Sequence, residues 1–142
     1  MKKMLLTLGF VLFGFASIAQ QNHIAISKSL VGFWRFSGTW VPNGSTLIIP
    51  TNNYKVINSD GTYYTFSVSN AITQITVWGR VEMTSDSTFT EFITKNGQNP
   101  GADNVRCFQT YKIEDGGSMM LSKYKNSDRW SNERWIRVPS VK

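Results

Sequence analysis

Histidine and cysteine are almost missing from this sequence, with His23 and Cys107 as the single members of their types among 142 residues. A lone imidazole leaves no second one for a His-rich zinc site, and its place near the predicted mature N-terminus is typical of a surface residue. Hydrolase triads are disfavoured for the same reason. One cysteine cannot form an internal disulfide, so we interpret Cys107 as a buried, inert thiol. We therefore expect no catalytic centre, no metal and no cofactor, and hence no enzyme.

Long apolar runs are also missing, and the one near the start of the chain is short. It covers Met4–Phe15, follows two lysines, and precedes the small residues Ser17 and Ala19. This is the pattern of a bacterial signal peptide, and the run is too short for a permanent membrane span. We expect residues 1–19 to be a signal peptide and residues 20–142 to form one exported domain, periplasmic or secreted, that does not span the membrane.

The positive charge is modest and dispersed. The formal net charge is +6, and loss of the two signal-peptide lysines would lower it by two. The remaining basic residues form no dense run of the kind that marks a nucleic-acid surface. We therefore expect no nucleic-acid partner.

Helical periodicity is scarce, whereas strand signals recur throughout the mature chain. Residues 23–30 could form a turn of helix that plugs one end of a barrel. Short alternating runs rich in β-branched and aromatic residues follow, separated by Asn, Asp, Gly and Pro. The segment 38–53 is loop-rich and predicts either a short edge strand or a lid. About eight strands joined by short hairpins predict an all-β fold, a single up-and-down antiparallel barrel. A β-sandwich is the alternative, because hairpin spacing alone does not exclude it.

The first and last strands carry residues suited to closing a barrel. Gly32 and Trp34 share a face of the first run, and a glycine two residues before an indole lets the ring lie over bare backbone. The last run contains Arg134 and Arg137, either of which could stack on Trp34. This contact would join the first strand to the last, as closure requires.

Two hairpins allow alternative arrangements. For residues 54–69 we favour a three-residue loop ending with a left-handed Gly61, which pairs Tyr54 and Val56 with an apolar face. For residues 72–95, pairing Met83 with Thr88 places Arg80 opposite Glu91. The inward face is then either the one with Val77 and Val81 or the one with Trp78, Arg80 and Glu91, which also carries Ile93, Glu82 and Phe89, and we favour the second.

A third hairpin joins residues 104–113 to 118–125. Its alternation places Cys107, Gln109 and Tyr111 on one face, with Met119 and Leu121 as neighbours. A polar bend over residues 126–132 is expected before the closing strand.

Four short motifs lie along the mature chain: Asp60-Gly61-Thr62, Gly79-Arg80-Val81, Asp86-x-Thr88-x-Thr90-Glu91-x-Ile93 and Glu133-Arg134-Trp135-x-Arg137-Val138. Together with the Gly32-x-Trp34 opening, they resemble an uncharacterised family of small exported bacterial lipocalin-like domains in the calycin superfamily. The resemblance implies an eight-stranded barrel whose open end admits small apolar molecules. It also implies that Trp34 lies at the closed end beneath Arg134 or Arg137.

These features lead to two functional hypotheses. The first is a non-catalytic protein that holds a small apolar or amphipathic ligand in the barrel. The candidate lining residues are Tyr54, Tyr64, Phe66, Trp78, Arg80, Phe89, Glu91, Tyr111 and Trp135. The second is a structural module that binds an envelope protein or glycan through its rim, where Trp40 and Trp130 could stack on sugar rings. Glu82, Glu91 and Glu133 are more consistent with structural ion pairs than with a glycosidase pair.

Overall fold

The computed structural model describes residues 24–41, 43–126 and 128–140. The expected signal peptide and His23 lie outside these residues. The strands in chain order are β1 (Gly32–Trp40), β2 (Thr46–Ile48), β3 (Asn53–Ile57), β4 (Thr62–Ser69), β5 (Ile72–Ser85), β6 (Thr88–Asn96), β7 (Val105–Glu114), β8 (Met119–Asn126) and β9 (Arg129–Arg137). Two single 3₁₀ turns, η1 (Pro100–Ala102) and η2 (Asp115–Gly117), complete the described elements.

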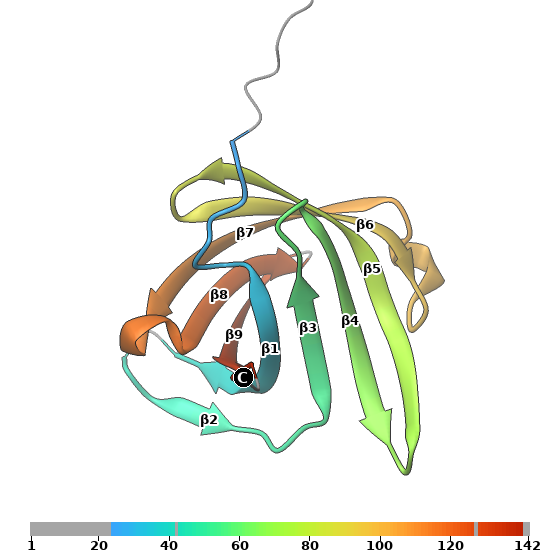
Figure 1. The fold of residues 1–142 in the computed structure, drawn as a ribbon, viewed down its shortest axis with the longest axis horizontal. Helices are drawn as coiled ribbons and strands as arrows, with labels where there is room; N and C mark the ends of the chain where they lie inside the picture. Colours follow the sequence, from blue (N-terminus) through green and yellow to red (C-terminus); the bar gives the residue numbers. More distant parts are fainter. Residues whose placement is uncertain (1–23, 42, 127, 141–142) are drawn as a thin grey trace, which may run out of the picture.

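The strands form a closed antiparallel barrel, which confirms the predicted fold class and excludes the sandwich. Neighbours in sequence pair with one another from β3 to β9, and β1 closes the ring by pairing with both β3 and β9 (Figure 1). The barrel itself has eight strands, and β2 is an extra short strand that pairs with the end of β1. It lies in the segment where an edge strand or a lid was expected. None of the helical turns in the described parts of the chain is long and apolar enough to cross a membrane.

The β3–β4 hairpin has the predicted register. Val56 lies opposite Tyr64 and Tyr54 opposite Phe66. Gly61 has a φ of +84°, the left-handed conformation that the three-residue loop needs. The apolar face of the hairpin does not point into the barrel, however. Lys55 is buried there, while Tyr54 and Val56 are only partly buried. The aromatic face of this hairpin therefore points outward.

The predicted register of the β5–β6 hairpin is wrong by one residue. Met83 pairs with Phe89 rather than Thr88, because a bulge at the turn shifts the strands between Met83 and Ser85. Glu91 therefore lies opposite Val81 and is buried, whereas Arg80 lies opposite Phe92 on the outside. A shift of the pairing by one residue changes which face of β5 lies beside the inward face of β6. Trp78 and Arg80 are therefore exposed instead of lining the barrel.

Two further expectations about the last strands are corrected. In β8 the inward residues are Met120, Ser122 and Tyr124, not Met119 and Leu121, since the first three pair with Ile113, Tyr111 and Gln109 on the inward face of β7. The expected bend at 126–132 is mostly strand, because β9 already begins at Arg129.

The apolar core fills one end of the barrel. Leu30 is fully buried there, at the end of a turn closed by a hydrogen bond from its backbone N–H to the Ser27 carbonyl. Thus a turn, rather than a helix, occupies the plug position before β1. The buried apolar residues of the core are Leu30, Trp34, Ile57, Tyr63, Val81, Met83, Phe89, Tyr111, Met120 and Trp135.

Candidate ligand cavity inside the barrel

A cavity of about 800 Å³ occupies the half of the barrel that the apolar core leaves unfilled. Its lining mixes aromatic and aliphatic side chains, such as Phe36 and Trp135, with charged and polar ones contributed by β3, β4 and β6 to β9. Because strand residues alternate between faces, each strand adds its inward residues to this lining. The barrel strands thus form most of the cavity, and the β6–β7 connection (residues 97–104) contributes to its border.

A buried ion pair crosses the barrel interior. The Lys55 ammonium on β3 donates a hydrogen bond of 2.7 Å to Glu91 Oε1 on β6, and both side chains are over nine-tenths buried. Burial alone would lower the pKa of Lys55, but the charges of Glu91 and Glu133 and the hydrogen bond to Glu91 outweigh it and raise that pKa. Lys55 therefore stays charged, and its ammonium also lies 4.8 Å from the centre of the Trp135 ring.

A second carboxyl group, that of Glu133 on β9, also lines the cavity. Its Oε2 accepts a 2.9 Å hydrogen bond from the indole N–H of Trp135. Desolvation raises the pKa of Glu133, and the charge of Glu91 adds to the effect, while the positive charge of Lys55 opposes it. In the described residues Glu133 takes part in no ion pair within 4.0 Å. The interior thus holds two carboxyl groups and one ammonium.

Two buried polar atoms in the lining have no hydrogen-bond partner within the described residues. They are the hydroxyl of Tyr63 and Oε1 of Gln109, and each residue is only 2% exposed. A buried polar atom left without a partner costs about 1–3 kcal/mol. Such atoms in a cavity wall are therefore positions where a bound molecule can hydrogen-bond.

Cys107 and Tyr124 also line the cavity, and both have raised pKa values. Burial raises the pKa of the Cys107 thiol to about 11, and the charge of Glu91 contributes to this shift. Burial likewise raises the pKa of Tyr124 to about 12, with a contribution from the charge of Glu133. Both groups are neutral at physiological pH, so Cys107 offers no activated nucleophile.

The sequence-predicted lining residues separate into four groups. Glu91 and Trp135 line the cavity. Phe89 and Tyr111 face inward but belong to the core at the closed end, where their rings pack 5.5 Å apart.

Tyr64, Trp78 and Arg80 lie on the outer wall, because the inward residues on their strands are Tyr63, Gly79 and Val81. Tyr54 and Phe66 border the cavity, but their rings stack on each other at 5.2 Å with Phe33 beside them. The prediction that Tyr64, Trp78 and Arg80 line a pocket inside the barrel is therefore wrong.

Sequence reasoning missed Lys55, Tyr63, Gln109 and Tyr124 as cavity residues. A lysine between two apolar residues usually marks a strand position that faces solvent. Lys55 faces inward instead, because its neighbours Tyr54 and Val56 pack on the outer wall. Gln109 was placed on the inward face by alternation, but nothing in the sequence marked it as a binding group.

The arginine that stacks on Trp34 is Arg137 rather than Arg134. The guanidinium carbon of Arg137 lies 4.1 Å from the centre of the Trp34 ring. A side chain at Gly32, whose φ is +151°, would collide with this guanidinium. Arg134 instead lies on the outside of the barrel, where it donates hydrogen bonds to Ser37 Oγ and to the Met119 sulfur.

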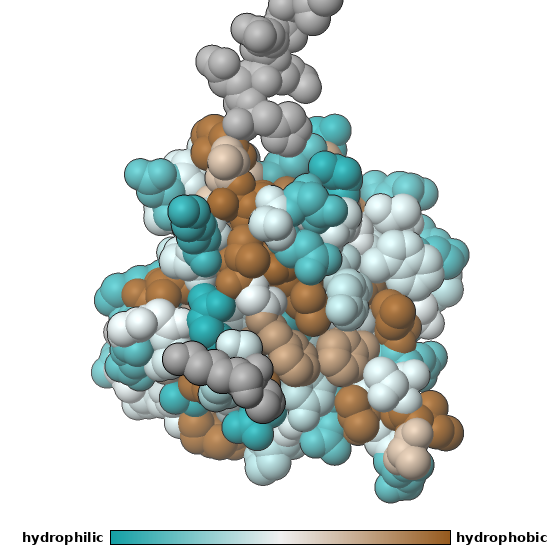
Figure 2. Space-filling view, in the orientation of Figure 1, coloured by the Kyte–Doolittle hydropathy of each residue, from teal (hydrophilic) through white to brown (hydrophobic). Residues whose placement is uncertain are grey.

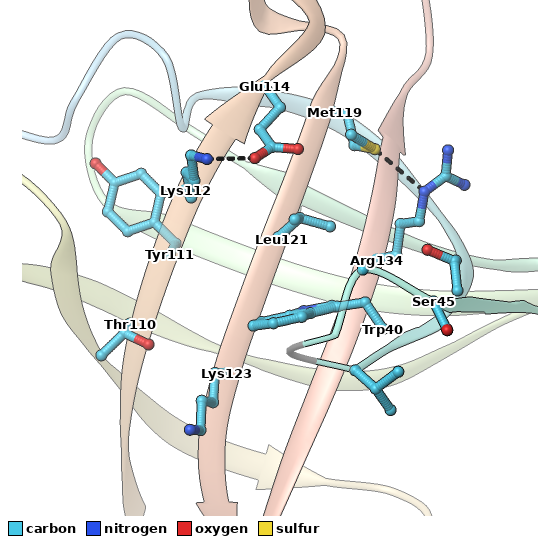
Figure 3. A pocket seen from close by; sticks show the side chains of 13 residues that line it. Trp40, Ser45, Thr110, Tyr111, Lys112, Glu114, Met119, Leu121, Lys123 and Arg134 are labelled. Atoms are coloured by element: carbon cyan, nitrogen blue, oxygen red, sulfur yellow. Dashed lines mark hydrogen bonds and ion pairs between the residues drawn. The ribbon is translucent and has the colours of Figure 1, made fainter.

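An outer groove of about 570 Å³ lies between the end of β1, the following loop and the outer face of β7 to β9. Figure 3 shows Trp40 across β8 beside Leu121 and Lys123, with Arg134 on the next strand. The Trp40 indole N–H donates to the Ser122 carbonyl at 3.2 Å, and Lys123 lies over the Trp130 ring. The two tryptophans therefore flank Lys123 on the outside wall. This groove is open to solvent and has no buried polar atom that lacks a partner.

The fold and the cavity together define a small closed antiparallel β-barrel with an internal cavity. The sequence matches the model of a domain of unknown function, DUF4488, over residues 29–142, and the chain belongs to that family. No curated protein matches the sequence at a significant level.

Proposed function

We propose that the protein is a non-catalytic binding protein that holds a small amphipathic molecule in the barrel cavity. The observation that carries this proposal is the cavity of about 800 Å³ with buried, unpartnered polar atoms in its wall. Ligand cavities typically combine apolar walls with a few polar groups that fix orientation. The mixture of Phe36 and Trp135 with Lys55, Glu91 and Glu133 favours an amphipathic ligand over a purely apolar one.

Binding without chemistry is consistent with how the ionisable groups are engaged. Glu91 is held by Lys55 and Glu133 by the Trp135 indole, while the Cys107 thiol keeps its proton. We further propose, from the signal-like start of the sequence, that binding takes place outside the cytoplasm.

The proposal is tested by blocking the cavity. Thr65 lines the cavity, whereas Thr90 lies on the outer face of β6, so Thr65→Trp and Thr90→Trp place the same bulk on opposite sides of the wall. Binding of the fluorescent probe 1-aminoanthracene should weaken at least about tenfold in Thr65→Trp and stay within about twofold in Thr90→Trp. Native mass spectrometry of the purified protein, with lipid extraction, should reveal a co-purifying small molecule. Equal probe binding by both variants would exclude the cavity as the site.

A second candidate function is an interaction module that binds a glycan or an envelope protein. The observation that favours it is the outer aromatic cluster of Phe33, Tyr54, Tyr64 and Phe66, whose rings lie 5.2 to 6.0 Å from their neighbours. Figure 2 shows hydrophobic side chains spread over β1, β3 and β4 on this face. Titration of soluble cell-wall oligosaccharides into the protein and into Tyr64→Ala tests it, since loss of binding in the variant would locate the site on the outer wall.

A further inference from the structure

The charge balance inside the cavity indicates which kind of headgroup its ligand carries. The charged side chains of the lining that face the barrel interior are Lys55, Glu91 and Glu133, and the first two form an ion pair, whereas Arg106 and Lys125 are exposed residues at its border. Glu133 is bound to the neutral indole of Trp135 and lies beside the neutral hydroxyl of Tyr124. The interior part of the cavity thus has one more carboxyl group than its own ammonium can balance.

Gln109 adds an independent observation that points to the same kind of ligand. Its Oε1, in a residue 2% exposed, has no donor among the described residues and lies in the cavity wall. Gln109 pairs with Tyr124 across β7 and β8, and Ser122, two residues before Tyr124, pairs with Glu133 across β8 and β9. Because these residues share the inward face of three adjacent strands, the amide oxygen and the carboxyl group belong to one section of the wall.

The available hydrogen-bonding atoms are therefore mainly acceptors. Gln109 Oε1 needs a donor, the Glu133 carboxyl group hydrogen-bonds to neutral groups, and the Tyr63 hydroxyl can donate or accept. A molecule that brings several N–H groups would satisfy them together. A protonated amine has three donors and a positive charge, which an alcohol lacks.

The cavity interior is unfavourable for an anionic headgroup. Such a headgroup would approach Glu91 and Glu133, and the Lys55 ammonium that could attract it is already engaged with Glu91 at 2.7 Å. Burying a further negative charge there would be costly, since the cation that could offset it is already paired.

We propose that the cavity binds an amphipathic amine, with its ammonium group between Glu133 and Gln109 and its apolar part toward the open end. This inference rests on the proposed binding function and specifies its ligand class. Phe36, Val77 and Ile93 line the same cavity and supply apolar contacts for the rest of the molecule. The raised pKa of Glu133 is consistent with a site that is completed by a cation, because a nearby positive charge favours the ionised carboxylate.

The experiment compares three probes of one chain length: octylammonium, octanol and octanoate, titrated at pH 7 by calorimetry. Octylammonium should bind at least about tenfold more tightly than either of the others, since its charged ammonium forms stronger hydrogen bonds to a carboxyl group than a neutral hydroxyl does. Glu133→Gln keeps an acceptor for Trp135 but removes the charge, and should weaken octylammonium binding about tenfold while leaving octanol within about twofold. Glu82→Gln, on the outer face of β5, is the matched control and should change neither affinity.

The outcomes separate this inference from the proposed function. Equal or tighter binding of octanol or octanoate would overturn the amine headgroup and leave the carrier role intact. Absence of binding by all three probes, together with unchanged 1-aminoanthracene binding in Thr65→Trp, would overturn both. If Glu133→Gln does not fold, the order of affinities for the three probes on the wild-type protein decides the inference.

Discussion

The guanidinium of Arg137, near the end of β9, lies flat against the Trp34 ring of β1 at 4.1 Å. The same guanidinium donates hydrogen bonds to the backbone carbonyls of Gly117, Val31 and Ser29. It therefore ties the η2 turn, the segment before β1 and the buried indole together at the closed end. Trp34 is in turn fixed by a 3.0 Å hydrogen bond from its indole N–H to the Leu30 carbonyl.

Removing this clamp should destabilise the whole barrel. Arg137→Ala loses the cation–π contact and three hydrogen bonds, so the free energy of unfolding should fall by about 2–4 kcal/mol in urea titrations. Arg137→Lys should recover less than half of the loss, because an ammonium cannot reproduce the planar fork. Arg35→Ala, at an exposed position of the neighbouring strand β1, should change stability by less than about 0.5 kcal/mol. Equal stability of Arg137→Ala and Arg35→Ala would contradict the role of the clamp.

Much of this fold could be predicted because its signals are local. Alternation and short turns specify hairpins, and Gly61 fixes the register of β3 against β4 through its left-handed conformation. Closure could be predicted because Gly32 and Trp34 begin the first strand and arginines end the last. The β5–β6 register could not, because the bulge between Met83 and Ser85 leaves no mark in the alternation.

The candidate site was less predictable, because part of the barrel wall has aromatic residues on its outer face and a charged residue on its inner face. Tyr54 and Tyr64 are outward although apolar faces usually point inward, and Lys55 is inward although charged residues usually point out. Strand alternation predicted Arg80 as the partner of Glu91, whereas its partner in the barrel is Lys55 on β3, a strand that does not pair with β6. A contact between strands that are not sequence neighbours depends on the closed ring, which no local pattern contains.

The Lys55–Glu91 pair should show strong energetic coupling. Lys55→Met leaves a buried carboxylate without its cation, and Glu91→Leu leaves a buried ammonium without its anion, so each should lower stability by about 3–5 kcal/mol. The double variant, with an apolar pair of similar volume, should lose much less than the sum of the two. The measurement is a double-mutant cycle by urea unfolding. Additive losses would mean that the two side chains do not depend on each other.

Cys107 should react slowly with thiol reagents while the barrel is folded. Its pKa of about 11 lies above the ordinary value of 9.0, so at pH 8 the folded protein holds less thiolate than the unfolded chain. Modification by 5,5′-dithiobis(2-nitrobenzoate) at pH 8 should be at least about tenfold slower in buffer than in 8 M urea. The folded thiol keeps its proton between pH 9 and 11, where the unfolded thiol loses it, so stability should fall as pH rises through this window. Cys107→Ala should reduce that slope, and equal modification rates in buffer and urea would show that the thiol is not shielded.

Gly79 should tolerate no side chain, because β5 and β6 approach each other closely at their second irregularity. A Cβ built on Gly79 would overlap the Phe92 carbonyl oxygen, which is backbone and cannot move aside. The strands also shift register between Trp78 and Gly79, so the close approach belongs to the bulge itself. Gly79→Ala should therefore lower the free energy of unfolding by about 2–3 kcal/mol. Gly97→Ala is the matched control, since the nearest atom to its Cβ, the Thr76 carbonyl oxygen, lies at an ordinary 3.5 Å, and its stability should stay within about 1 kcal/mol of the wild type. A Gly79→Ala protein as stable as Gly97→Ala would mean that the strands can separate at the bulge without loss.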